Sequence, residues 1–158
     1  MVTVRPATMA DLDALTALLQ VLFAIEADFA CDAARQRRGL AMMLASPAAC
    51  VLVAEANGQV IGMATGQTTI STAEGGFALL VEDVVVEAGW RGKGIGRRLL
   101  TALAGWAGAK GIGRLQLLAD RNNQPALDFY RRIGWQHTEL ICLRQRLLAC
   151  QKPPPLAE

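Results

Sequence analysis

The stretch VEDVVVEAGWRGKGIGRRLL, residues 81–100, decides how the chain folds. It continues a nearly unbroken apolar run from Phe77, which is typical of a central strand buried on both faces. Three glycines follow at positions 92, 94 and 96, and apolar residues then recur at helical spacing from Ile95 to Trp106. The stretch therefore predicts a buried strand, a glycine-rich loop and a helix.

The loop between this strand and helix favours an anionic ligand. Four of the chain's 16 Lys and Arg residues fall between Arg91 and Arg98. Glycines let a ligand approach the backbone, and a helix start directs free N–H groups and a positive dipole end at it. A multiply charged phosphate is the natural ligand, and a glycine-rich turn with solvated charges is the alternative. The spacing matches neither a P-loop nor the Gly-x-Gly-x-x-Gly dinucleotide fingerprint.

Periodicity and turn residues predict the elements around this unit. Asn57-Gly58 suits a tight turn between two strands, since both positions tolerate positive φ. A helix joins the strand at 77–86 to one at 114–119, so these two strands should be parallel. Further strands are expected at about 2–5, 50–56, 59–70, 135–137 and 140–148, and further helices at about 8–23, 32–45 and 123–134.

Bulk properties limit the classes of function. The chain has 158 residues, 53% of them apolar, which predicts one domain at 1–150 and a tail at 151–158. A net charge of +2 gives no case for a nucleic-acid partner. No apolar run suggests a membrane span or a signal peptide, and the four scattered cysteines suggest neither disulfides nor a metal site. We therefore expect a cytoplasmic protein with no metal, no nucleic acid and no membrane partner.

Two motifs resemble those of the GNAT superfamily of N-acetyltransferases. Arg91-x-x-Gly94-x-Gly96 is similar to the family's Gln/Arg-x-x-Gly-x-Gly/Ala motif. Residues 123–135, NQPALDFYRRIGW, are similar to its Asn-x-x-Ala-x-x-Phe-Tyr-x-x-x-Gly-Phe pattern, with Trp135 at the position where Phe is commoner. The resemblance covers residues 2–147. Within the family, residues 81–86, VEDVVV, resemble the corresponding segment of enzymes that act on diamines and on glucosamine phosphate.

The resemblance implies a fold and a cofactor. The fold would be a mixed α/β domain whose central, mainly antiparallel sheet contains one splayed parallel strand pair, flanked by about four helices. Acetyl-CoA would enter at the splay as co-substrate, its pyrophosphate on the loop and its pantetheine arm along the strand. The implied cofactor-binding residues are Val84, Val85, Val86, Arg91, Gly92, Lys93, Gly94, Ile95, Gly96, Arg97, Asn123 and Tyr130.

Three residues are candidates for the chemistry. The resemblance places the hydroxyl of Tyr130, the only tyrosine, near the thioester sulfur as the acid for the departing thiolate. Its alternative is a core aromatic. Glu82 is a candidate base and Asp83 a candidate substrate-binding residue, because two acids in an apolar strand need a cation, hydrogen bonds or a ligand. Structural ion pairs, or a water chain as base, are the alternatives.

The expected reaction is direct attack of a primary amine, of a small molecule, on acetyl-CoA in a ternary complex. Two other functions stay open: acetylation of a protein N-terminus or lysine, and a non-catalytic acyl-CoA-binding module. A covalent cysteine mechanism is disfavoured, because neither Cys142 nor His137 is placed to support one. The apolar composition is compatible with a homodimer.

Overall fold

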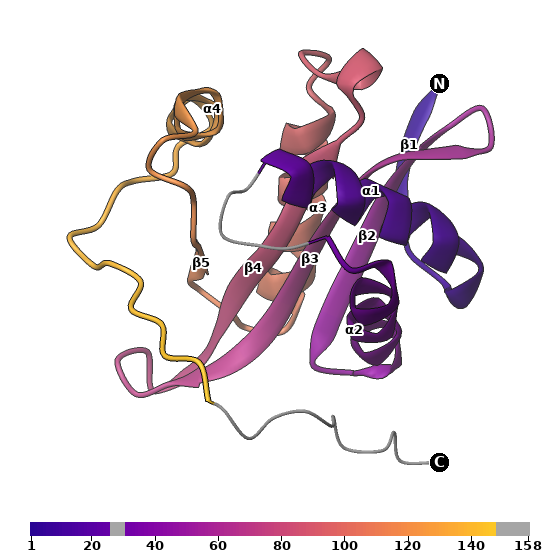
Figure 1. Cartoon of the computed structure of the whole chain (residues 1–158). Coiled ribbons are helices and arrows are strands. Elements are labelled where there is room, and N and C mark those ends of the chain that lie inside the picture. Colours follow the sequence, from indigo (N-terminus) through magenta and orange to yellow (C-terminus); the bar gives the residue numbers. More distant parts are fainter. Residues whose placement is uncertain (26–30, 148–158) are drawn as a thin grey trace. The chain divides into compact units, whose positions relative to one another are not determined.

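In the computed structural model, residues 1–25 and 31–147 are described. The chain divides into two compact units, Met1–Leu117 and Leu118–Glu158, and each is described by itself. The prediction of one domain over residues 1–150 stays a prediction. The first unit contains the sheet, the glycine loop and three of the four α-helices found in the described residues (Figure 1).

A five-stranded sheet in the order β1-β2-β3-β4-β5 forms the first unit. Neighbouring strands are antiparallel except β4 and β5, which are parallel. The predicted mixed α/β fold with a mainly antiparallel sheet and one parallel pair is therefore confirmed. The strands are β1 (Val2–Pro6), β2 (Ala49–Ala56), β3 (Gln59–Ser71), β4 (Gly76–Val86) and β5 (Leu115–Leu117).

The turn between β2 and β3 forms as the sequence predicts. Asn57 has a φ of 51° and Gly58 a φ of 77°. Two successive positive φ values match the twist of a tight hairpin, and Asn and Gly reach them at the lowest cost. This turn fixes the pairing of β2 with β3 and so the position of β3 beside β4.

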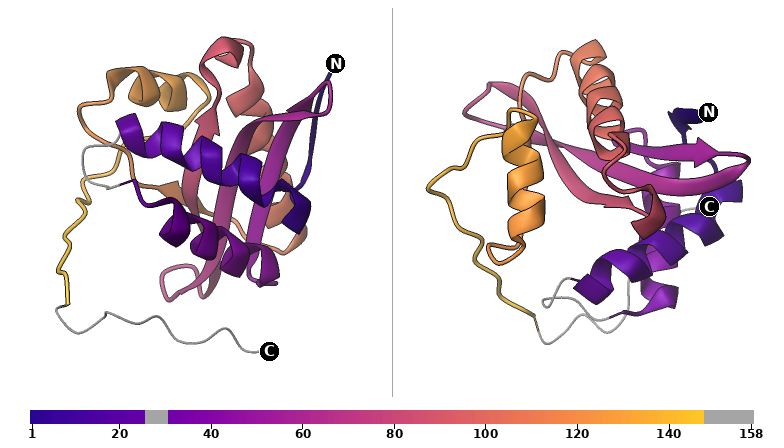
Figure 2. Two further views of the ribbon diagram at one scale, coloured as in Figure 1. Left: turned by 45° about the vertical axis from the view of Figure 1, so that its right-hand side comes forward. Right: turned by 90° about the horizontal axis from the view of Figure 1, so that it is seen from above.

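Helices cover both faces of the sheet, with α1 (Leu12–Ile25) and α2 (Ala33–Ala45) on one face and α3 (Ile95–Ala109) on the other (Figure 2). Short 3-10 turns lie at Met9–Asp11 and Ala88–Trp90. Asp32 caps α2, because its side chain accepts a hydrogen bond from Arg35 N–H at 3.1 Å.

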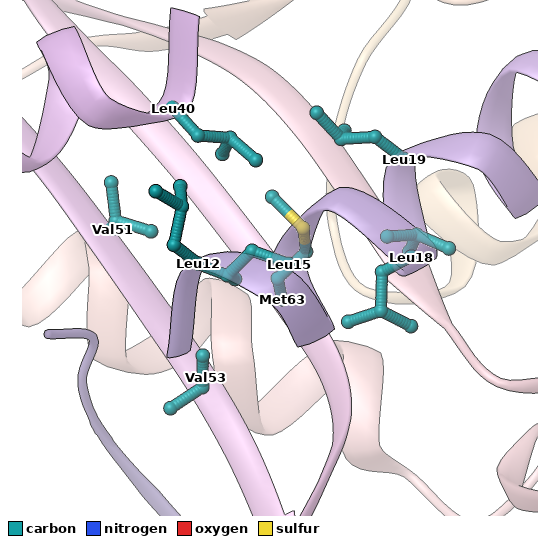
Figure 3. Close-up of a cluster of buried hydrophobic side chains, with 9 residues drawn as sticks. Leu12, Leu15, Leu18, Leu19, Leu40, Val51, Val53 and Met63 are labelled. Atoms are coloured by element: carbon teal, nitrogen blue, oxygen red, sulfur yellow. The ribbon is translucent and has the colours of Figure 1, made fainter. Parts of the chain in front are cut away.

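The core under α1 and α2 holds the first unit together. Figure 3 shows leucines of both helices directed at side chains of β2 and β3. Burying such side chains contributes roughly 1.5–3 kcal/mol each before the entropy cost of ordering them. The buried cluster consists of Leu12, Leu15, Leu18, Leu19, Leu40, Val51, Val53, Met63 and Val85.

An ion-pair network ties β1 to the start of α1 and to β2. The Arg5 guanidinium donates to Asp11 Oδ1 and Oδ2 at 2.8 and 2.9 Å and to Glu55 Oε2 at 2.6 Å. Asp11 also accepts the backbone N–H of Thr8 at 2.7 Å. These hydrogen bonds, led by those of Arg5, lower the pKa of the Asp11 carboxyl to about 2.

In the second unit, α4 (Gln124–Arg132) is the only regular element among the described residues. The predicted closing strands are wrong for residues 135–147, which form no strand, and residue 148 lies outside the described residues. The apolar pattern there suggested strands, but a strand also needs a partner for its backbone hydrogen bonds. The side chains of Leu140 and Leu143 are each 86% exposed.

Candidate cofactor and acceptor site

Strand β4 is paired on both sides over only part of its length. It pairs with β5 from Leu79 to Val81, where Leu79 donates its N–H to the Arg114 carbonyl at 2.9 Å. From Val84 to Val86, β3 is its only ladder partner among the described residues. The parallel pairing thus ends at Val81, and among the described residues no strand pairs with the edge of residues 84–86 that faces away from β3, which we call the open edge of β4.

The register shows which residues turn their backbone toward that open edge. Glu87 donates its N–H to the Ile61 carbonyl at 2.9 Å, so Glu87 faces β3. The backbone N–H and C=O groups of successive residues point to opposite edges of a strand, so those of Val85 also point to β3, opposite Met63. Those of Val84 and Val86 point to the open edge. Val85 in addition buries its side chain in the core under α1. Of the three predicted valines, the outer two can pair with an extended ligand.

The glycine loop has the conformation that an anion-binding turn requires. Gly92 and Gly94 both have a φ of 75°, and a Cβ built on either would meet no atom within 4 Å. Gly94 is the N-cap of α3 and provides no side-chain cap, so the first N–H groups of the helix are left for a ligand. Ile95 is buried, so only its backbone is available to a cofactor.

The cations of the loop have different surroundings. Arg91 donates from Nε to the Val86 carbonyl at 2.9 Å, which binds the loop to the end of β4. Lys93 Nζ lies 4.7 Å from the ring centroid of Trp90, a cation–π contact. Arg98 donates to the Val2 carbonyl at 2.8 Å, and Arg97 is exposed. Arg91, Lys93 and Arg97 are each adjacent in sequence to a glycine of the loop.

The two acids of β4 lie in a β-bulge. Ala64 pairs with Val84 and Gly66 with Val81, so Thr65 alone stands opposite both Glu82 and Asp83. Glu82 is exposed, whereas Asp83 is 8% exposed. The Thr65 hydroxyl accepts the N–H of Asp83 and donates to its Oδ2, both at 3.1 Å. Two adjacent acids therefore have different environments, one in solvent and one buried.

In the second unit, Asn123 is the N-cap of α4 and Tyr130 lies within that helix. The Asn123 side chain accepts the N–H of Ala126 at 3.2 Å, so it caps the helix. Tyr130 is half-buried, with the rings of Phe129 and Trp135 at 5.2 and 5.7 Å between centroids. These contacts hold the Tyr130 ring within its own unit. The roles of Asn123 and Tyr130 toward a cofactor stay predictions.

The residue that sequence reasoning missed is Thr65. It is fully buried, and nothing in its local pattern distinguishes it from other strand threonines. Its importance depends on the β3–β4 register, which a single sequence does not reveal. Of the groups set aside earlier, His137 and Cys142 are exposed, and burial raises the pKa of the Cys50 thiol to about 11.

Neither a metal site nor a membrane span is found within the described ranges. No group of three or more His, Cys, Asp or Glu side chains there could hold an ion. No helix in the same residues is long and apolar enough to cross a bilayer. The expectation that the protein needs no metal stays a prediction.

Comparison with known families decides the classification. Residues 16–135 match the family described as the Acetyltransferase (GNAT) family. The chain belongs to the GNAT acetyltransferase family. The predicted membership is thus confirmed, and the open edge of β4 and the glycine loop both lie inside the matched segment of this GNAT protein.

Relatives of this GNAT protein include enzymes named for antibiotics. It is 39% identical over 74 residues to streptothricin acetyltransferase of Streptomyces lavendulae, a match that covers 47% of this chain and 39% of that protein. The match thus spans well under half the length of that relative.

Solved structures share the fold. A predicted acetyltransferase of Clostridium acetobutylicum, solved with acetyl-CoA, is 25% identical, with a TM-score of 0.74 over 91% of this chain and 96% of that one. An aminoglycoside 6'-N-acetyltransferase of Acinetobacter haemolyticus is 20% identical, with a TM-score of 0.79 over 92% and 99%.

Proposed function

We propose that the protein is an acetyl-CoA-dependent N-acetyltransferase that acetylates a primary amine of a small molecule. The observation that carries the proposal is the open edge of β4, which runs directly into a left-handed glycine loop and an uncapped helix start. An edge strand suits an extended amide-bearing arm, and the loop with the helix start suits a pyrophosphate. Acetyl-CoA has both parts in this order.

In this proposal each cofactor-binding residue has a specific role. Val84 offers its backbone N–H and C=O groups, and Val86 its backbone N–H, to the pantetheine amides. The N–H groups that follow Gly94 meet the pyrophosphate, with Lys93 and Arg97 supplying positive charge. Arg91 holds the loop to β4 through the Val86 carbonyl.

The chain's acids and its tyrosine would handle the protons. A protonated amine must lose a proton before its nitrogen can attack the acetyl carbonyl, and exposed Glu82 is our candidate base, directly or through water. Buried Asp83 would attract the cationic amine and orient it. As the bond between carbonyl carbon and sulfur breaks, the Tyr130 hydroxyl would protonate the departing thiolate.

The preference for a small-molecule acceptor rests on the relatives. Streptothricin acetyltransferase and the aminoglycoside 6'-N-acetyltransferase are both named for small-molecule antibiotics. A protein acceptor and a non-catalytic acyl-CoA-binding module are the alternatives. The homodimer and the cytoplasmic location stay predictions.

The acceptor proposal is tested by a screen of small amines in which released CoA thiol is measured. Diamines and amino sugars should be better acceptors than amines next to a carboxylate, because Glu82 and Asp83 would repel the latter. Glu82→Gln and Asp83→Asn should each weaken amine use without greatly altering acetyl-CoA affinity. Preferred acetylation of acidic amino acids would contradict this reading. Acetyl-CoA binding without turnover on any amine or protein would favour the binding module.

The role of Tyr130 is tested separately with Tyr130→Phe. This change keeps the ring that packs on Phe129 and Trp135 and removes only the hydroxyl. We expect kcat to fall by about 10- to 10,000-fold, the range of acid catalysis, with acetyl-CoA affinity little changed. A wild-type kcat in this variant would end the general-acid assignment.

A further inference from the structure

The bulge in β4 is held by one side chain of β3. Thr65 is fully buried and stands alone opposite Glu82 and Asp83. Its Oγ1 lies 3.1 Å from the backbone nitrogen of Asp83 and 3.1 Å from the carboxylate Oδ2 of the same residue. One hydroxyl therefore contacts both the main chain and the side chain of a single acid.

The direction of these two hydrogen bonds follows from the groups involved. A backbone N–H can only donate, and an ionised carboxylate can only accept. The Thr65 hydroxyl must then accept from the Asp83 N–H and donate its single proton to Oδ2. Because threonine is branched at Cβ, its χ1 has few alternatives in a strand. The hydroxyl thus fixes the bulged backbone and the rotamer of the Asp83 carboxylate together.

We propose that Thr65 is a positioning residue for acceptor specificity, which orients the Asp83 carboxylate toward the cationic amine of the substrate. This inference rests on the proposed function. Thr65 has no exposed surface and cannot contact an acceptor, so it acts only through Asp83. Solvent can reach the exposed Glu82 directly, whereas the buried Asp83 has its geometry set by β3.

The test is a double-mutant cycle with Thr65→Val and Asp83→Asn. Valine keeps the shape of threonine and removes the hydroxyl, and Thr65→Ser restores a hydroxyl. Thr16→Val is the matched control, because Thr16 is also buried and its hydroxyl donates to the Leu12 carbonyl at 2.7 Å. For each variant, kcat and KM for the best amine, acetyl-CoA affinity and hydrogen exchange of the Asp83 amide are measured.

Thr65→Val should lower kcat/KM for the amine by about tenfold or more, mainly through KM, the effect of one hydrogen bond to a charged group. Acetyl-CoA affinity should stay the same, and the Asp83 amide should exchange faster. Thr65→Ser and Thr16→Val should stay within about twofold of wild type, since neither loses the contact to Asp83. In the Asp83→Asn background, Thr65→Val should cost less than about twofold, because the two residues act as a unit.

Two outcomes would overturn the inference in different ways. Additive effects of Thr65→Val and Asp83→Asn, or a loss in Thr16→Val equal to that in Thr65→Val, would make Thr65 a packing residue and leave the proposed function intact. If Asp83→Asn itself uses the amine as well as wild type does, Asp83 does not bind the acceptor. Thr65 then has no positioning role. Failure of the proposed function as a whole would appear earlier, as no acetylation of any amine by the wild-type protein.

Discussion

The two halves of strand β4 are similar in sequence character but differ in the bonds that their backbones make. Leu79–Val81 lies between β3 and β5 and is hydrogen-bonded on both sides. Within residues 1–25 and 31–147, Val84–Val86, beyond the bulge, pairs with β3 alone. Both segments are apolar, so hydrophobicity does not distinguish them. The first half can contribute only to the fold, whereas the second keeps an edge available for a ligand.

The bulge also changes which residues of β4 direct their backbone N–H groups away from β3. Before it, the odd-numbered Leu79 turns its N–H to the β5 side, toward Arg114. After it, by alternation from Glu87, the even-numbered Val84 and Val86 face that side. One extra residue thus decides which amides of β4 point away from β3.

The largest expected effect is a difference in the free energy of unfolding between two proline variants at adjacent positions, Val85→Pro and Val86→Pro. Proline lacks an N–H, so Val85→Pro should break the ladder to Met63 and reduce the free energy of unfolding by on the order of 3 kcal/mol or more. Val86→Pro removes an N–H at the open edge, where proline is tolerated. It should stay folded and weaken acetyl-CoA binding by up to about tenfold. Urea unfolding and titration calorimetry measure both effects, and equal destabilisation by the two changes would refute the assignment of the edge.

The next effect is the stabilisation of the protein by acetyl-CoA. Gly94→Asp in the glycine loop should remove it, and Gly58→Asp is the matched control. The two glycines have φ values of 75° and 77°, and neither has an atom within 4 Å of an added Cβ. Both variants should therefore lose similar stability without ligand. Acetyl-CoA at about 100 times its dissociation constant should stabilise wild type and Gly58→Asp by roughly 2.7 kcal/mol and Gly94→Asp hardly at all. A full ligand shift in Gly94→Asp would place the phosphates elsewhere.

The smallest effect lies outside β4, at Asp11 in the short 3-10 turn before α1. Its pKa is about 2 in the folded protein against 3.8 as the ordinary value, so the unfolded chain takes up its proton first as pH falls. The resulting stability, at most about 2 kcal/mol, is present above pH 4 and is lost as pH falls toward 2. Asp11→Asn should remove this contribution at pH 7, and its difference from wild type should shrink toward pH 2.

Asp13→Asn is the control for this acid effect, because the Asp13 side chain is exposed and pairs with Arg37 at the surface. Surface ion pairs contribute little to stability. Urea unfolding of wild type and the two variants between pH 7 and pH 2 measures the effect. An Asp11→Asn curve parallel to that of wild type over this range would show that Arg5 does not stabilise the Asp11 carboxylate.

Local sequence predicted those features that depend on neighbouring residues. The turn at Asn57-Gly58 and the loop with a helix starting at Ile95 formed as expected, and Asp32 and Asn123 cap their helices. In each of these, a few consecutive residues set the backbone conformation through φ preference or a side-chain hydrogen bond. The parallel pairing of β4 and β5 also followed, because a helical connection leaves little alternative.

Features that depend on pairing between distant strands could not be predicted. The partnership of Thr65 with Asp83 requires the β3–β4 register, and the choice of Val84 and Val86 over Val85 depends on the bulge. The strands expected at 135–147 had the right apolar pattern, but a pattern does not supply a hydrogen-bonding partner.

Residue-resolved amide hydrogen exchange, with and without acetyl-CoA, tests the central claim most directly. In the free protein the Val85 amide should exchange slowly, because it pairs with β3, and the amides of Val84 and Val86 should exchange faster. Acetyl-CoA should slow exchange at Val84 and Val86 and at the first amides of α3, with little selective change at Leu79. Binding that leaves the Val84 and Val86 amides unprotected would contradict the account, because the cofactor would then not lie along the open edge of β4.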